Sequence, residues 1–109
     1  TTTKVEDPLI EKIVELVKAN LQNPEFNVKS LADMLFMSQP TLYRKVKQIT
    51  GFTIIELVRG VRLKEAAELL KTKQYGIQEV SEMVGYNDVP TFRKHFVALY
   101  GTTPSTFAG

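Results

Sequence analysis

Basic side chains, which can donate hydrogen bonds to phosphates or to base edges, gather in two windows of this 109-residue chain. The windows are residues 39–50 and 89–103, and neither contains an aspartate or a glutamate. Their basic residues are Arg44, Lys45 and Lys47 in the first window and Arg93, Lys94 and His95 in the second. One charged helix face is ordinary solvated surface, but two acid-free windows at matched positions favour contact with a nucleic acid.

The charge of the chain is distributed unevenly, although its formal net charge is only +2. Residues 1–38 carry four Lys or Arg against six Asp or Glu, a balance of −2. Residues 39–109 carry ten against six, a balance of +4, and both basic windows lie in this part.

The windows belong to a pattern that occurs twice along the chain. The matching segments are residues 31–35 with 80–84, at an offset of 49, and residues 40–46 with 90–96, at an offset of 50. The extra residue falls between the two matches, at 36–38 in the first copy and 85–88 in the second. This predicts a turn, because a helix interior cannot absorb an insertion without rotating its apolar face. Each copy is therefore expected to be a short helix, a turn and a second, basic helix.

Apolar periodicity and capping residues predict an all-α fold of about seven helices. The expected helices are 8 to about 23, 28–35, 39–50, 53–71, 77–84, 89–100 and a last one from 103–104. The helix over 53–71 starts with a Thr53/Glu56 capping box and would be roughly 27 Å long. The sequence thus predicts two homeodomain-like helix-turn-helix units joined by a long central helix. The expected segments are a flexible linker at 1–6, a first unit at 7–52, the connecting helix at 53–71 and a second unit at 72–109.

The first basic helix has an apolar side and a polar side. Its expected core positions are Leu42, Val46 and Ile49. Its candidate binding residues are Gln39, Pro40, Tyr43, Arg44 and Lys47. Arg44 can donate two bonds to a guanine, and Gln39 can pair with an adenine. Tyr43 offers its ring to a thymine methyl group or its hydroxyl to a phosphate.

The second basic helix offers a different set of side chains. Its expected core positions are Phe92, Phe96 and Leu99. Its candidate binding residues are Val89, Pro90, Arg93 and Lys94, with Val97 beside them. Arg93 is the natural base reader, whereas Val89 and Pro90 have no side-chain donor and can only press on methyl groups or sugars, so this helix should discriminate less sharply. Pro40 and Pro90 also fit ordinary first-turn positions of a helix, with no role in binding.

Composition argues against several classes of function. The chain has no cysteine and a single histidine, His95, so we expect no metal site, no cofactor and no enzymatic activity. No apolar run approaches the roughly 20 residues that span a bilayer, which favours a cytoplasmic domain. The remaining alternative is an all-α module whose basic helices bind an acidic protein or RNA. A steep salt dependence and a preference for one duplex sequence would distinguish DNA binding from this alternative.

From about residue 7 to residue 107 the chain resembles the DNA-binding domain of the AraC/XylS family of bacterial transcription regulators. The matching residues are Leu31-Ala32, Met37-Ser38, Leu42-Tyr43-Arg44, Lys47, Gly51, Arg62-Leu63, Ala66-Ala67, Ile77, Val80, Gly85-Tyr86, Thr91-Phe92, Phe96 and Tyr100-Gly101-Thr102-Thr103-Pro104-Ser105. The chain departs from the family pattern at Val46, where an aromatic residue is usual, and at Val97, where a basic residue is usual.

The resemblance implies sequence-specific binding of double-stranded DNA by a monomeric domain, with RNA polymerase as a second partner. It places the recognition positions on the candidates named above, in two successive major grooves. Two contacted segments about one helical turn apart predict an operator of roughly 17–20 base pairs, and because the two helices differ in sequence, we expect it to be asymmetric. Within the family, residues 38–44 and 84–96 most resemble the C-terminal output domain of a Bacteroidetes-type hybrid two-component regulator. This resemblance implies a full-length protein anchored in the inner membrane, and it is compatible with a full-length dimer.

Overall fold

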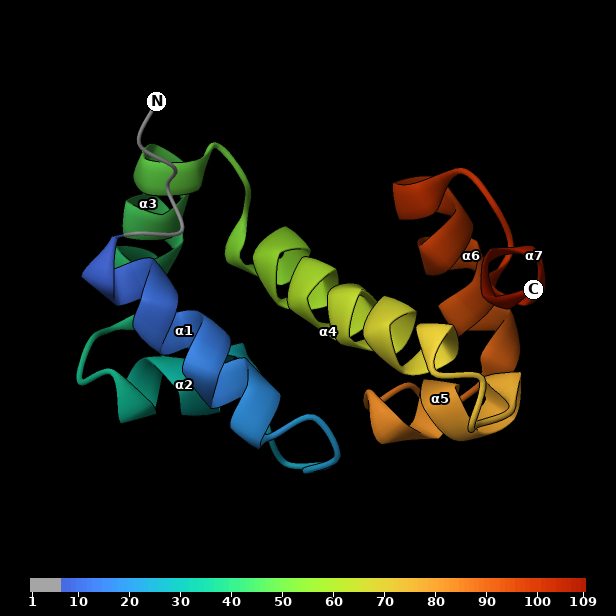
Figure 1. Ribbon diagram of the computed structural model, residues 1–109. Helices are drawn as coiled ribbons and strands as arrows, with labels where there is room; N and C mark the ends of the chain where they lie inside the picture. The colour runs from blue at the N-terminus through green and yellow to red at the C-terminus, as the bar shows by residue number, and fades with distance from the viewer. Residues whose placement is uncertain (1–6) are drawn as a thin grey trace. The chain divides into compact units, whose positions relative to one another are not determined.

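The computed structural model describes residues 7–109 and contains seven helices and no strand within them, which confirms the predicted all-α fold (Figure 1). The helices are α1 (Pro8–Ala19), α2 (Val28–Met34), α3 (Gln39–Thr50), α4 (Ile54–Lys71), α5 (Ile77–Met83), α6 (Val89–Tyr100) and α7 (Pro104–Ala108). The chain divides into two compact units within α4, after Arg59. Each unit therefore includes part of the connecting helix, and the predicted segments 7–52, 53–71 and 72–109 stay a prediction. The predicted linker at 1–6 lies outside the described residues.

Side-chain caps determine where α3 and α6 begin. The Ser38 hydroxyl accepts a hydrogen bond from the Thr41 amide at 3.2 Å, and the Asp88 carboxylate accepts one from the Thr91 amide at 2.7 Å. The two helices end at Gly51 and Gly101, with φ values of 81° and 74°. A left-handed residue that closes a helix is most often glycine. Because all of these signals are local, both helices have the predicted bounds.

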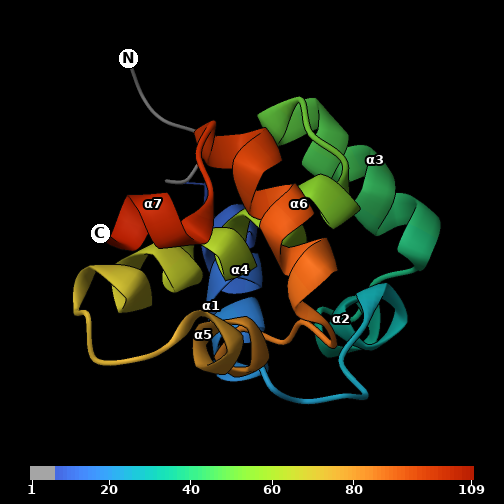
Figure 2. The same cartoon turned by 90° about the vertical axis from the view of Figure 1, so that its right-hand side faces the viewer.

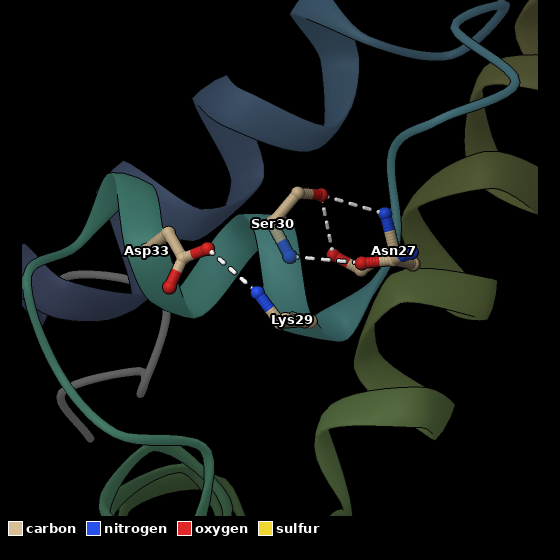
Figure 3. A network of polar contacts seen from close by, with 4 residues as sticks. All are labelled: Asn27, Lys29, Ser30 and Asp33. Carbon is tan, nitrogen blue, oxygen red and sulfur yellow. Dashed lines mark hydrogen bonds and ion pairs between the residues drawn. The ribbon is translucent and has the colours of Figure 1, made fainter.

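A reciprocal pair of hydrogen bonds starts α2 (Figure 3). The Asn27 side chain accepts from the Ser30 amide at 2.8 Å, and the Ser30 hydroxyl accepts from the Asn27 amide at 2.8 Å. Lys29 and Asp33 form an exposed ion pair at 3.4 Å along the same helix. Both α2 and α5 end one residue earlier than predicted, because the last predicted residue is the C-cap in each case.

The first helix, α1, is shorter than its apolar pattern predicts. It ends at Ala19, and the expected extension to residue 23 is wrong. The Asn20 backbone leaves the helical conformation, with φ −125° and ψ 23°. The Asn20 side-chain amide donates to the Leu16 carbonyl at 2.7 Å. This asparagine therefore terminates the helix before Asn23 and Pro24, whose sequence predicts the end at about residue 23.

The connecting helix, α4, is the longest, with 18 residues and a length of about 27 Å. Its predicted capping box is confirmed: the Thr53 amide donates to Glu56 Oε1 at 2.9 Å, and the Glu56 amide donates to Thr53 Oγ1 at 3.1 Å. Ile54 and Leu63 of this helix are buried. Among the described residues, no helix is long and apolar enough to cross a membrane.

Apolar side chains from all of its helices fill the first unit. The buried residues are Ile10, Ile13, Val17, Phe26, Leu31, Ala32, Leu42, Val46 and Ile54. The expected core positions of α3 are confirmed at Leu42 and Val46, whereas Ile49 is only half-buried. Met34 of α2 is 40% exposed, although it lies one turn after the buried Leu31. The recognition face of α3 is therefore held outward mainly by two buried residues one turn apart.

In the second unit, α5 and α7 both pack against α6 (Figure 2). The buried cluster is Leu63, Ala66, Ala67, Leu70, Val80, Val84, Phe92 and Phe96. The prediction that Leu99 belongs to the core is wrong, because this side chain is 53% exposed. The ring of Tyr100 takes the inward place, with ring centroids 4.7 Å from Phe96 and 5.4 Å from Phe107 of α7.

The turns that precede α3 and α6 share one backbone geometry. Phe36 and Gly85 both have positive φ, at 57° and 94°. The matched hydrogen bonds run from the Met37 amide to the Ala32 carbonyl (3.1 Å) and from the Tyr86 amide to the Ser81 carbonyl (2.9 Å). Since this match extends through Tyr86, the extra residue of the second copy is Asn87. The predicted insertion in a turn is therefore confirmed.

Candidate nucleic-acid interface

The five candidates on α3 are all exposed. They are Gln39, Pro40, Tyr43, Arg44 and Lys47. Their spacing of i, i+1, i+4, i+5 and i+8 places them along one side of the helix. The buried residues Leu42 and Val46 lie on the other side, so packing of the first unit directs this row of side chains outward.

Lys47 already has a partner within its own unit. Its ammonium donates to the Gly51 carbonyl at 2.8 Å. A cation in the last turn satisfies an unpaired carbonyl and complements the helix dipole. Because an ammonium group has three donors, Lys47 can keep this bond and still contact a phosphate.

Among the described residues, four basic side chains of the two helices have no internal partner: the exposed Lys45 and three of the candidate binding residues. Within residues 7–109, Arg44, Arg93 and Lys94 make no hydrogen bond and no ion pair, and all three are exposed. A phosphate or a base edge that meets these groups would not have to displace an acidic side chain. Their charge is therefore fully available to a ligand.

The outward face of α6 is less polar than that of α3. Pro90, Arg93 and Lys94 are exposed as expected, whereas Val89 is half-buried and offers less surface than its candidate role assumed. Val97 is 38% exposed and occupies the position that matches Lys47. The second helix thus presents its two cations between apolar residues.

The two helices also differ in the charge at their first turn. Hydrogen bonds from the backbone amide and then the side chain of Thr91 lower the pKa of Asp88, so this carboxylate is charged at neutral pH. The matching cap of α3 is the neutral hydroxyl of Ser38. A helix N-terminus attracts anions, and a carboxylate already placed there repels them. The start of α3 is therefore the better place for a phosphate.

A polar cluster in the second unit was missed by the sequence analysis. Arg62 of α4 donates from Nη1 to the Val84 carbonyl at 2.8 Å, and burial lowers the pKa of Arg62. The Tyr86 hydroxyl shares a hydrogen bond with His95 Nδ1 at 2.9 Å. His95 belongs to the second basic window, yet it is half-buried. No local pattern indicates these contacts, because their partners lie 22 and nine residues apart.

Comparison with known proteins identifies the family of this domain. A family model described as a helix-turn-helix domain matches residues 31–109. The chain is 34% identical over 107 residues to Histidine kinase P4 of Formosa agariphila, and the aligned region covers 98% of this chain and 8% of that protein. It is 35% identical over 102 residues to the uncharacterized transcriptional regulatory protein YesN of Bacillus subtilis, and the aligned region covers 91% of this chain and 28% of that protein. The chain thus spans less than a third of either relative.

Solved structures agree with the family match. The C-terminal domain of AraT, a response regulator from Geobacillus stearothermophilus, matches with a TM-score of 0.82 and 27% identity over 94% of this chain and 84% of that one. The DNA-binding domain of AdpA, solved with a target DNA, matches with a TM-score of 0.81 and 28% identity over 94% of this chain and 91% of that one. The chain belongs to the AraC-type helix-turn-helix domains, which bind DNA in transcription regulators and are not enzymes.

Proposed function

We propose that α3 and α6 are two recognition helices and that each enters a major groove of the same duplex. The observation that carries this proposal is the presence of two exposed cations, Arg44 and Lys94, at matched positions of the two helices, with Arg93 beside Lys94; within residues 7–109 none of the three has an internal partner. The major groove is about 12 Å wide and accepts one α-helix. The opposite side of each helix is buried in its own unit, which leaves only this side for DNA.

On α3, we assign base reading to the first two turns. Arg44 donates two hydrogen bonds to a guanine, and Gln39 pairs with an adenine. Tyr43 contacts a thymine methyl group or a phosphate, and Pro40 packs on the backbone beside it. Lys47, one turn further, contacts a phosphate while it keeps its bond to the end of the helix.

On α6, base reading depends mainly on Arg93. Lys94 contacts a phosphate or a second base, because both cations are exposed and, within residues 7–109, have no internal partner. Val89 and Pro90 press on methyl groups or sugars. This half of the site should therefore tolerate more base changes than the half read by α3.

The proposed DNA site is asymmetric because one domain carries two different readers, and it is roughly 17–20 base pairs long because it includes two successive major-groove segments. The length of α4, about 27 Å, is close to the roughly 34 Å of one turn of B-DNA once the widths of the recognition helices are added. Two contacted segments about 10 base pairs apart then face the same side of the duplex. Bending of the DNA would bring both helices fully into their grooves.

An insertion of five base pairs between the two contacted segments tests this proposal. The insertion turns one segment to the opposite face, so binding should fall to the level of a site with one segment randomised. An insertion of ten base pairs is less informative because bending and flexibility can compensate. The bipartite model is wrong if the five-base-pair insertion leaves the affinity of the selected site unchanged.

Replacement of Arg44 tests the assignment of a base reader. If Arg44 contacts a guanine through two bonds, Arg44→Ala should cost about 1–3 kcal/mol of binding free energy and relax specificity at one position. The measurement compares the selected site with all of its single-base variants. A uniform loss across the variants would reassign Arg44 to the phosphate backbone.

We also propose that this domain is the cytoplasmic output domain of a membrane-anchored two-component regulator, with RNA polymerase as its second partner. The support is the similarity to a protein named a histidine kinase and to the C-terminal domain of a response regulator. The domain itself would act as a monomer. A dimer of the full-length protein would then require two copies of the whole site, as direct or inverted repeats.

A further inference from the structure

A polar cluster ties the second recognition helix to the turn before it. The cluster consists of Arg62 on α4, the Val84 carbonyl at the end of α5, Tyr86 in the turn and His95 on α6. All of these groups belong to the second unit. None of them is among the residues proposed to touch DNA.

Arg62 anchors the start of the turn. Its guanidinium donates to the carbonyl of Val84, the C-cap residue of α5, at 2.8 Å. The last carbonyls of a helix lack partners within the helix, so this bond satisfies one of them. Gly85 follows with a φ of 94°, and the chain then reverses toward α6. The position of the turn is therefore determined by a side chain from α4.

Tyr86 carries the connection to α6. Its hydroxyl lies 2.9 Å from His95 Nδ1, and its ring meets those of His95 and Phe92 edge to face, at centroid distances of 5.5 and 5.4 Å. Phe92 and Phe96 lie one turn apart on one line of the helix, and a helix held along one line can roll about it. The bond at His95 lies off this line and restrains such a roll.

The first unit has no tyrosine and no histidine at the positions that match Tyr86 and His95. The residues that match Tyr86 and His95 are Met37 and Lys45. A thioether is at best a weak acceptor, and the Lys45 side chain is exposed to solvent. The duplication therefore isolates the tyrosine–histidine bond as a property of α6 alone.

We propose that Tyr86 and His95 are positioning residues for DNA recognition: with Arg62 holding the turn, they fix the rotation of α6 about its axis and so the direction of Arg93 and Lys94. The inference rests on the proposed role of α6. A recognition helix whose orientation is set before binding loses less freedom when it meets DNA. Removing one hydrogen bond of this kind should weaken binding about three- to ten-fold.

The test measures the affinity of each variant for the selected site and for a DNA in which the α6 half is randomised. Tyr86→Phe removes only the hydroxyl, and His95→Ala removes its partner. Each should weaken binding to the selected site about three- to ten-fold and leave binding to the half-randomised DNA unchanged. The double variant should be no weaker than the weaker single variant, because the bond is already lost.

Two further variants separate positioning from general destabilisation. His95→Asn keeps a polar atom near the place of Nδ1 and should recover part of the loss. Tyr75→Phe removes the hydroxyl of another tyrosine, in the segment between α4 and α5, and should change neither affinity nor melting temperature.

Each outcome of the affinity measurements has a clear meaning. Equal losses on both DNAs, or no loss on the selected site, would overturn the positioning role. If wild-type protein bound both DNAs equally well, the proposed role of α6 would itself be wrong. That result is distinguishable, because it appears before any variant is made.

Discussion

The turn before α3 contains a strained residue whose replacement should stabilise the protein. Phe36 has a φ of 57° and its side chain is 96% exposed. The left-handed conformation costs an L-residue about 1–2 kcal/mol, and an exposed ring gains almost nothing in return. Phe36→Gly removes this cost, since glycine adopts positive φ freely. The matched position of the second unit already has glycine, Gly85, with a φ of 94°.

The expected gain is the difference of three contributions. Relief of backbone strain contributes about 1–2 kcal/mol, and the greater freedom of glycine in the unfolded chain removes about 0.4–1 kcal/mol. The ring covers only about 10 Å² of apolar surface at this exposure, which is worth roughly 0.25 kcal/mol. Phe36→Gly should therefore raise the free energy of unfolding by about 0.5 kcal/mol and the melting temperature by about 2–4 °C.

The assay is urea and thermal unfolding of the wild-type protein, Phe36→Gly and the reciprocal variant Gly85→Ala. Gly85→Ala should have the opposite sign and lower the free energy of unfolding by about 0.5–1 kcal/mol, because it introduces a side chain at positive φ. A loss of stability in Phe36→Gly would refute the reasoning. It would mean that the exposed ring makes contacts worth more than the backbone strain.

Two further predictions concern buried polarity and acid sensitivity. Ser81 is 1% exposed, and its hydroxyl has no hydrogen-bond partner within the described residues. Ser81→Ala should therefore raise the free energy of unfolding, measured with urea, by about 1 kcal/mol. The first unit already has alanine, the buried Ala32, at the matched position. A lower free energy of unfolding in the variant would show that the hydroxyl has a partner. The folded-state pKa of Asp88 is lowered, so its capping contribution is present above the ordinary Asp value of about 3.9 and is lost as the pH falls through the folded value. Unfolding measured from pH 5 down to pH 3 should show a smaller loss of stability in Asp88→Asn than in the wild-type protein, and equal slopes would contradict the prediction.

The bounds of α3 and α6, and the turn between matched helices, could be predicted from the sequence alone. They depend on Ser38, Asp88, Gly51 and Gly101, whose effects act within one helical turn. The two acid-free faces were also evident, because periodicity assigns Leu42 and Phe92 to the core and leaves Arg44 and Arg93 outside. A duplicated helix-turn-helix domain with two basic helices was therefore determined by local chemistry and repetition.

Only the tertiary structure decided which side chains along those helices are buried or hydrogen-bonded and which are exposed to solvent. Leu99 has the right spacing for the core, but Tyr100 takes the inward place because the ring of Phe107, from α7, lies against it. The sequence pattern predicts His95 as one of the basic residues on the surface of α6. In the structure, its Nδ1 instead shares a hydrogen bond with the hydroxyl of Tyr86, from the turn before the helix. Such outcomes depend on which side chains from distant parts of the sequence pack against each helix. Helical periodicity within one segment carries no information about these contacts.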